Sequence, residues 1–191
     1  MDAPPMETTT VNIPNLLSIS RILAVPVFIL LMIDPTPLRA LMAGMVFSVA
    51  SATDWLDGFL ARRWGQITKL GKLLDPIADK ILITSALIML IDIEGIRVPA
   101  WIAIVIISRE FAVTGLRAIA SSDGIVIPAE TMGKYKTGAQ ITAVIALLLD
   151  YHLGTGWINA LGWAALWAAM VLAVYSGVQY FMSYWKQLNK T

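Results

Sequence analysis

Four aspartates in an otherwise apolar part of the chain have the spacing of a metal site. Asp54 and Asp57 are three residues apart, and Asp75 and Asp79 are four apart, so on helices each pair lies on one face. Two carboxylates 4 Å apart repel by roughly 4 kcal/mol at an effective dielectric constant near 20. Two divalent cations would cancel the four charges, and ligation by carboxylates without His or Cys favours Mg²⁺ or Mn²⁺.

Small and basic residues beside these acids suit a phosphate ligand. Gly58 and Ala61 share the helical face of the first acid pair and leave room for a ligand to approach the backbone. Arg62, at the edge of that face, can bind phosphate through two parallel hydrogen bonds. Gly71 would let the segment between the two acid pairs approach a ligand closely. The segment Asp54–Asp79 therefore predicts two metal ions that hold a pyrophosphate during phosphoryl-type transfer.

Long apolar runs would position these residues in a membrane. Of the 191 residues, 58% are hydrophobic and 14% are charged, whereas soluble domains average about 25% charged residues. A helix needs about 20 apolar residues to cross a bilayer. We predict a polar N-terminal arm at residues 1–11 and a single membrane-embedded domain at residues 12–191. This all-α domain would have six transmembrane helices, at Leu16–Ile33, Leu38–Ala61, Pro76–Ile91, Pro99–Ile119, Gly138–Leu149 and Trp157–Trp185.

Basic residues predict which end of these helices faces the cytoplasm. Cytoplasmic loops are enriched in Lys and Arg. Most such residues follow the second, fourth and sixth predicted helices, whereas the opposite side has only Arg39 and Arg97. Both termini and the acidic segment should therefore lie on the cytoplasmic side of the cell's inner membrane. An aromatic belt at this interface is expected from Tyr175, Tyr180, Tyr184 and Trp185.

Local signals at two predicted helix starts allow structural as well as functional interpretations. Pro76 suits the first turn of a helix, which makes Asp75 a candidate N-cap as well as a metal ligand. Asn15, near the start of the first predicted helix, either lines the nucleotide side of the site or caps the helix. Asn12, Ser18 and Arg21 are also candidates to line that side of the site. Their structural alternative is helix capping for Asn12 and Ser18, and for Arg21 a long side chain that extends its charge to the membrane surface.

A charged group inside the fourth predicted helix is a candidate anion site. Glu110 and Arg117 are seven residues apart on one helical face, and Arg109 lies beside them. Charges within a span indicate either a structural ion pair between helices or a functional pocket. Lys134 and Lys136 would add positive charge from the start of the fifth helix, although flanking lysines are common on the cytoplasmic side. The functional interpretation is a pocket for the phosphate of a phosphorylated acceptor.

The acidic segment is similar to a known signature. The pattern Asp54-x2-Asp57-Gly58-x2-Ala61-Arg62-x8-Gly71-x3-Asp75-x3-Asp79 resembles that of the CDP-alcohol phosphotransferase family at every position. The resemblance implies a six-helix membrane fold, four aspartate ligands for two divalent cations, a homodimer and a CDP-linked donor, usually CDP-diacylglycerol. It also implies that CMP leaves when an acceptor hydroxyl attacks the β-phosphate, with Asp79 as general base. The implied residues for the cytidine diphosphate are Gly58, Ala61, Arg62, Gly71 and Thr68.

Other stretches resemble the phosphatidylglycerophosphate synthase branch of this family, whose acceptor is sn-glycerol 3-phosphate. They begin at Asn12, Arg109 and Gly133, and read Asn-Ile-Pro-Asn-Leu-Leu-Ser, Arg-Glu-Phe…Gly-Leu-Arg and Gly-Lys-Tyr-Lys-Thr. Enzymes that use inositol phosphate, serine or phosphatidylglycerol share the main signature, so those acceptors remain alternatives. A membrane ion or metal transporter is an alternative of another class, but it would place acids near mid-membrane and often show paired halves. No nucleic-acid partner is expected.

Overall fold

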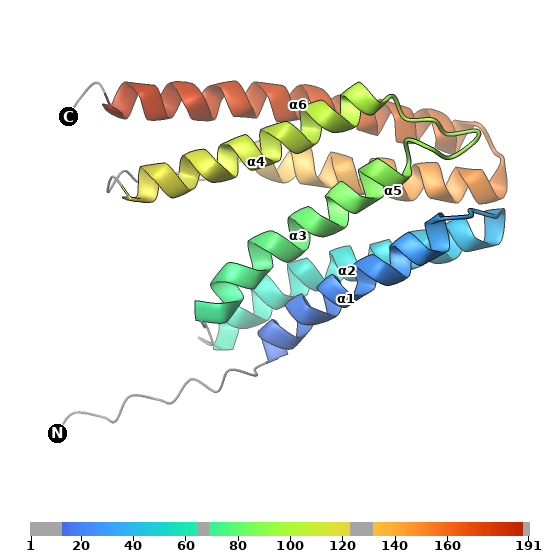
Figure 1. Cartoon of the computed structure of the whole chain (residues 1–191), viewed down its shortest axis with the longest axis horizontal. Helices are drawn as coiled ribbons and strands as arrows, with labels where there is room; N and C mark the ends of the chain where they lie inside the picture. The colour runs from blue at the N-terminus through green and yellow to red at the C-terminus, as the bar shows by residue number, and fades with distance from the viewer. Residues whose placement is uncertain (1–12, 65–68, 123–131, 189–191) are drawn as a thin grey trace.

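A computed structural model describes residues 13–64, 69–122 and 132–188, with the side chains of residues 13–15, 54–64, 69–76 and 132 outside the description. This part of the chain is all-α, has no strand, and forms six helices (Figure 1). The helices are α1 (Ile13–Met32), α2 (Pro37–Trp64), α3 (Lys69–Met89), α4 (Ala100–Ser122), α5 (Met132–Leu153) and α6 (Trp157–Leu188). The all-α prediction and the order of six helices are thus confirmed.

Several helices extend beyond the apolar runs that predicted them. The third begins at Lys69 rather than Pro76, and the fifth begins at Met132 rather than Gly138. Hydropathy detects only the apolar part of a helix, whereas a helix can continue into polar sequence outside a bilayer. One prediction was wrong for this reason: Asp75 lies within α3, so it is not the N-cap of that helix.

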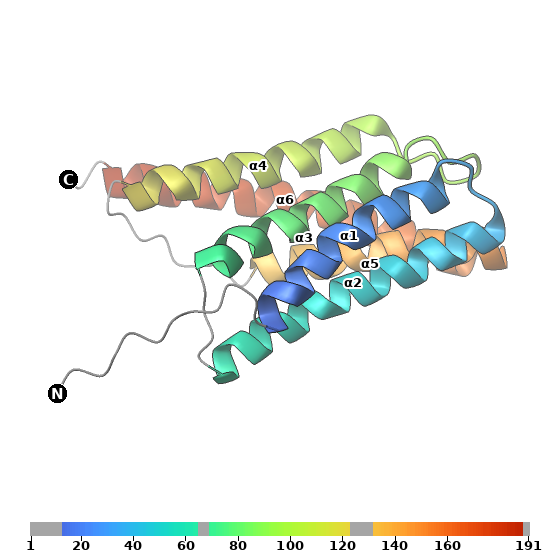
Figure 2. The same ribbon diagram turned by 60° about the horizontal axis from the view of Figure 1, so that its bottom comes forward.

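Consecutive helices run in opposite directions along one long axis, as Figures 1 and 2 both show. One end of the bundle therefore gathers the start of α1, α3 and α5 and the end of α2, α4 and α6. Every segment with predicted chemistry belongs to this end, including the acidic parts of α2 and α3 and the basic parts of α4 and α5. The alternation positions segments that are far apart in sequence around one site.

Apolar packing holds the helices together. The most extensive helix pair is α5 with α6, α1 packs against α2 and α3, and α4 packs against α6. Phe28 and Phe47 are fully buried between α1 and α2, with their ring centroids 6.0 Å apart. At Gly162 on α6, a Cβ atom would lie 3.1 Å from the backbone nitrogen of Leu147 on α5. Glycine thus allows the close approach of these two helices.

Large apolar side chains also cover the outside of the bundle. Leu30, Val49 and Trp157 are 69%, 65% and 67% exposed, and extensive exposed apolar surface marks a membrane or protein contact. Within the described residues, α6 alone is long enough and has a long enough apolar stretch to qualify, by length and composition, as a membrane span. Leu16–Met32 and Pro37–Thr53 are shorter apolar helical segments. The count of six spans and the cytoplasmic position of the termini stay predictions.

Candidate active site

A cavity of about 410 Å³ lies where α3, α4, α5 and α6 meet, at the end of the bundle that gathers the charged segments. Its charged lining comprises five cations and two carboxylates, so its formal charge is +3. Such a concave site concentrates anions. The charged lining residues are Asp79, Lys80, Arg109, Glu110, Arg117, Lys134 and Lys136. The fold thus brings all five predicted acceptor-site residues together with the predicted base.

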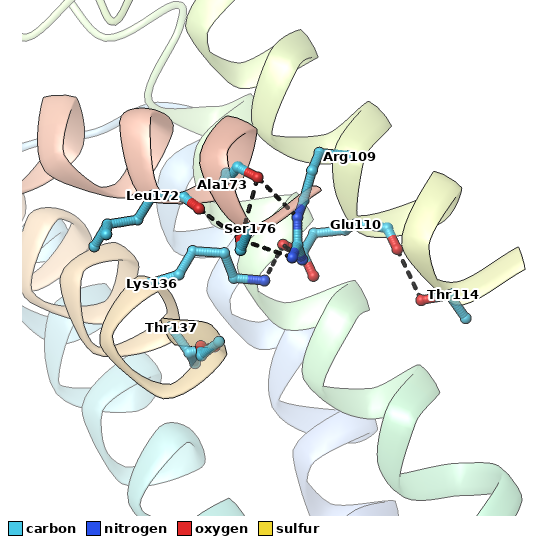
Figure 3. Close-up of polar contacts among 9 residues, drawn as sticks. Arg109, Glu110, Thr114, Lys136, Thr137, Leu172, Ala173 and Ser176 are labelled. Atoms are coloured by element: carbon cyan, nitrogen blue, oxygen red, sulfur yellow. Dashed lines mark hydrogen bonds and ion pairs between the residues drawn. The ribbon is translucent and has the colours of Figure 1, made fainter. Parts of the chain in front are cut away.

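Glu110 pairs with cations from two helices. Its Oε1 atom accepts a hydrogen bond from Nζ of Lys136 on α5, and it lies 3.4 Å from Nη1 of Arg109 on α4 (Figure 3). The side chains of Glu110 and Lys136 are only 16% and 6% exposed. Lys136 lies just before the predicted span Gly138–Leu149. Burial lowers the pKa of Lys136, whereas the nearby Glu110 carboxylate acts to raise it. Glu110 therefore links one cation on its own helix with one on α5.

Arg109 is held from the opposite side by α6. Its Nε atom donates a hydrogen bond to the carbonyl oxygen of Ala173 at 3.0 Å, and its Nη2 atom donates to Oγ of Ser176 at 2.8 Å. Figure 3 shows the Arg109 side chain extending from α4 to these acceptors. The guanidinium is therefore fixed at the cavity wall by two bonds to one neighbouring helix.

Arg117, two turns further along α4, also contacts α6. Its Nε atom donates to the hydroxyl oxygen of Tyr180 at 2.8 Å, and its Cζ atom lies 4.7 Å from the centre of the Tyr180 ring. Tyr180 is only 2% exposed, so its assignment to an interfacial aromatic belt was wrong. Tyr175 and Trp185 are 50% and 57% exposed and remain candidates for that belt.

Comparisons with known proteins place the chain in a family. Residues 11–175 match the model of the CDP-alcohol phosphatidyltransferase family. This chain belongs to that family. It is 42% identical to the CDP-diacylglycerol–glycerol-3-phosphate 3-phosphatidyltransferase of Bacillus subtilis (strain 168), over 93% of this chain and 97% of the relative. Proteins of the same name from Pseudomonas fluorescens and Rickettsia bellii (strain RML369-C) are 40% and 37% identical, covering 93% and 89% of this chain and 92% and 93% of the relatives.

In this member of the CDP-alcohol phosphatidyltransferase family, the acidic segment has the helical placement that its spacing requires. Asp54 and Asp57 lie within α2, and Asp75 and Asp79 lie within α3. Each pair therefore shares a helical face. Asp79 lines the cavity, whereas the other predicted metal and donor ligands have no described side chain. These are Asn15, Asp54, Asp57, Gly58, Ala61, Arg62, Thr68, Gly71 and Asp75, of which Thr68 lies outside the described helices altogether.

Sequence reasoning missed the contribution of α6. The chain beyond Gln140 reads as generic membrane helix, yet Ser176 and Tyr180 line the cavity and bind its two arginines. One signal was available: these two polar residues are four apart, so they lie on one face of the helix. They also lie near the end of the sixth helix, which an alternating bundle places beside the basic part of the fourth.

Proposed function

We propose that this protein transfers the phosphatidyl group of CDP-diacylglycerol to sn-glycerol 3-phosphate, giving phosphatidylglycerophosphate and CMP. The observation that carries the proposal is the cationic cavity beside Asp79. Three relatives that cover most of the chain are named for this donor and acceptor. The names specify the two substrates, and the cavity supplies a place on this chain for the smaller one.

The cavity suits a small phosphate monoester. Arginine can hold two phosphate oxygens at once, and lysine adds a point charge. Arg109, Arg117, Lys134 and Lys136 would therefore bind the acceptor's phosphate, with Glu110 orienting Lys136 and Arg109. Serine carries no phosphate. The phosphate of phosphatidylglycerol is a diester with one negative charge, and this lipid also carries two bulky acyl chains. The formal charge of +3 therefore favours a dianionic acceptor.

Asp79 is the proposed general base. Its side chain lines the same cavity as the cations, so an acceptor whose phosphate is bound there can present its primary hydroxyl to the carboxylate. As Asp79 takes the hydroxyl proton, the oxygen bonds to the β-phosphorus of the donor. The bond from that phosphorus to the CMP oxygen breaks, and CMP departs with the electron pair. The cavity orients the acceptor, which is one source of rate enhancement.

The candidate metal ligands fit two hard divalent cations, Mg²⁺ or Mn²⁺. These four candidate ligands are all aspartates, and they lie on α2 and α3, toward the same end of the bundle. Asp54, Asp57, Asp75 and Asp79 would hold the cations, and bound cations would attract the diphosphate of the donor and stabilise the charge that develops during transfer. We assign binding of the cytidine diphosphate to Asn15, Gly58, Ala61, Arg62, Thr68 and Gly71.

The proposed location is the inner membrane, with six spans and the active end in the cytoplasm. This arrangement is supported by exposed apolar side chains around the bundle and by the basic residues at its charged end. A lipid donor in the bilayer and a water-soluble acceptor would meet at this interface. A homodimer, implied by the family resemblance, would be tested by the mass of the detergent-solubilised protein.

An acceptor panel tests the proposal. Purified protein in detergent would receive CDP-diacylglycerol, Mg²⁺ and one of four acceptors: glycerol 3-phosphate, inositol 1-phosphate, serine or phosphatidylglycerol. We expect CMP release and phosphatidylglycerophosphate formation with glycerol 3-phosphate at the highest kcat/KM. A higher kcat/KM with any other acceptor would assign the enzyme to another branch of its family. Binding or transport of a cation without CMP release would favour the transporter alternative.

A further inference from the structure

Two side chains of α6 contact the cationic cavity without belonging to any predicted motif. Ser176 and Tyr180 are only 1% and 2% exposed, and both line the cavity. We propose that they are positioning residues, which hold the guanidinium groups of Arg109 and Arg117 in the orientation that binds an acceptor phosphate. The inference rests on the proposed function and assigns acceptor affinity in part to α6.

Ser176 presents a fixed hydrogen-bond acceptor to Arg109. Its hydroxyl donates to the carbonyl oxygen of Leu172 in the preceding turn of α6, so an oxygen lone pair is left for Nη2 of Arg109. The carbonyl of Ala173 accepts from Nε of the same arginine. Two adjacent N–H groups are thus bound to one rigid helix. An unrestrained arginine side chain samples many rotamers, and a phosphate that binds it must order them.

Gly177 leaves the space that the Arg109 side chain needs. A Cβ atom at this position would lie 3.1 Å from Cγ and 3.6 Å from Nε of Arg109. The added methyl group would therefore push the arginine away from its acceptors on α6. At Gly44 on α2, the same ideal Cβ position makes only an ordinary contact, 3.6 Å from Cβ of Leu148, which makes this glycine a matched control.

Tyr180 contacts Arg117 through the Nε atom rather than through the terminal amino groups. The tyrosine hydroxyl oxygen accepts the Nε–H, and the ring lies against the guanidinium. Within the described residues, no hydrogen bond engages Nη1 or Nη2 of Arg117. These two groups form a fork that can bind two phosphate oxygens. Fixing Nε at the cavity wall therefore determines the direction in which the fork points.

Steady-state kinetics of the full-length protein test the inference through two KM values. Tyr180→Phe removes the hydroxyl but keeps the ring, and Ser176→Ala removes the second acceptor. Each variant loses a bond that orients an arginine rather than a bond to the substrate. We therefore expect KM for glycerol 3-phosphate to rise by about five- to tenfold, less than the loss of a direct hydrogen bond to a charged group would cause. We expect KM for CDP-diacylglycerol to change less than about twofold. Gly177→Ala should act in the same direction through steric displacement of Arg109.

Matched variants separate positioning from general damage. Tyr175→Phe removes an exposed hydroxyl on α6 that accepts from Gln179, and Ser48→Ala removes a hydroxyl bonded to the backbone of α2. With Gly44→Ala, these controls should keep both KM values. If Tyr180→Phe yields no folded protein, Ser176→Ala and Gly177→Ala decide the question.

The outcomes distinguish this inference from the proposed function. Equal increases in both KM values, or wild-type kinetics in Tyr180→Phe, Ser176→Ala and Gly177→Ala, would overturn the positioning role while leaving the reaction established. If the wild-type protein does not use glycerol 3-phosphate at all, the proposed function itself fails. A selective rise in the acceptor KM in the cavity variants supports both.

Discussion

Glu110 on α4 and Lys136 on α5 form an ion pair that joins two helices at the wall of the cationic cavity. Sequence alone left two interpretations of the charges in α4, a structural ion pair and an anion pocket. The geometry combines them, since the pair links helices and also borders the pocket. Because the pair is buried, removing either partner would leave the other as an unpaired buried charge, which costs far more than an unpaired exposed one.

Glu110→Gln should therefore destabilise the protein. Loss of one partner of a buried pair typically costs about 3–5 kcal/mol, so we expect a clear fall in the midpoint of thermal unfolding in detergent. The matched control is Asp34→Asn, which breaks an exposed pair with Arg39 and should cost less than about 1 kcal/mol. Equal midpoints for the two variants would show that the Glu110–Lys136 pair contributes nothing to stability.

Arg117→Ala should weaken acceptor binding with little effect on the donor. A hydrogen bond to a charged group contributes about 1.5–3 kcal/mol, so KM for glycerol 3-phosphate should rise at least tenfold. Kinetics with each substrate varied in turn would measure the effect. Arg97→Ala, which removes an exposed arginine from the opposite end of the bundle, serves as the control. A parallel rise in KM for CDP-diacylglycerol would instead assign Arg117 to structure.

Local patterns predicted most of the fold and part of the site. Apolar runs located six helices because burial and hydropathy follow from residue type, and their alternation placed Asp79 near Arg109 and Arg117. The start of α3 was misplaced because the helix from Lys69 to Asp75 is too polar for a hydropathy signal. The bounds of a helix therefore need not coincide with those of its membrane-spanning part.

Contacts between distant helices were beyond local patterns. Tyr180 looks like an interfacial aromatic residue when only its position near a helix end is known. Its burial depends on how α6 is rotated against α4, and the two helices approach each other closely where Gly177 meets the Arg109 side chain. Nothing within a few residues of Tyr180 specifies Arg117, 63 positions earlier, as its hydrogen-bond donor. The four-residue spacing of Ser176 and Tyr180 indicates a polar face on α6, but it does not indicate which residues that face contacts.

Asp79→Asn should abolish turnover while donor binding largely persists. The amide cannot accept the hydroxyl proton, and loss of a general base typically lowers kcat by about 10²- to 10⁴-fold. CMP release would report turnover, and equilibrium binding of labelled CDP-diacylglycerol would report the donor site. Asp92→Asn changes an exposed acid near the other end of α3 and should have wild-type kinetics. Near-normal kcat in Asp79→Asn would remove Asp79 from the base role.

Removal of divalent cations should stop the reaction reversibly. Four aspartates on the ends of two helices would repel one another and the donor's diphosphate without compensating positive charge. We therefore expect EDTA to eliminate CMP release, and excess Mg²⁺ or Mn²⁺ to restore it. Hard oxygen ligands suit both ions, so either should work.

Thermal unfolding separates this effect from chelator damage to the fold. The midpoint of the wild-type protein should rise on addition of Mg²⁺, because a ligand that binds only the folded state stabilises it. Asp57→Asn should lose most of that rise, since it removes one proposed ligand, whereas Asp92→Asn should keep it. CMP release that survives EDTA, or equal stabilisation of both variants by Mg²⁺, would contradict a metal site at Asp54, Asp57, Asp75 and Asp79.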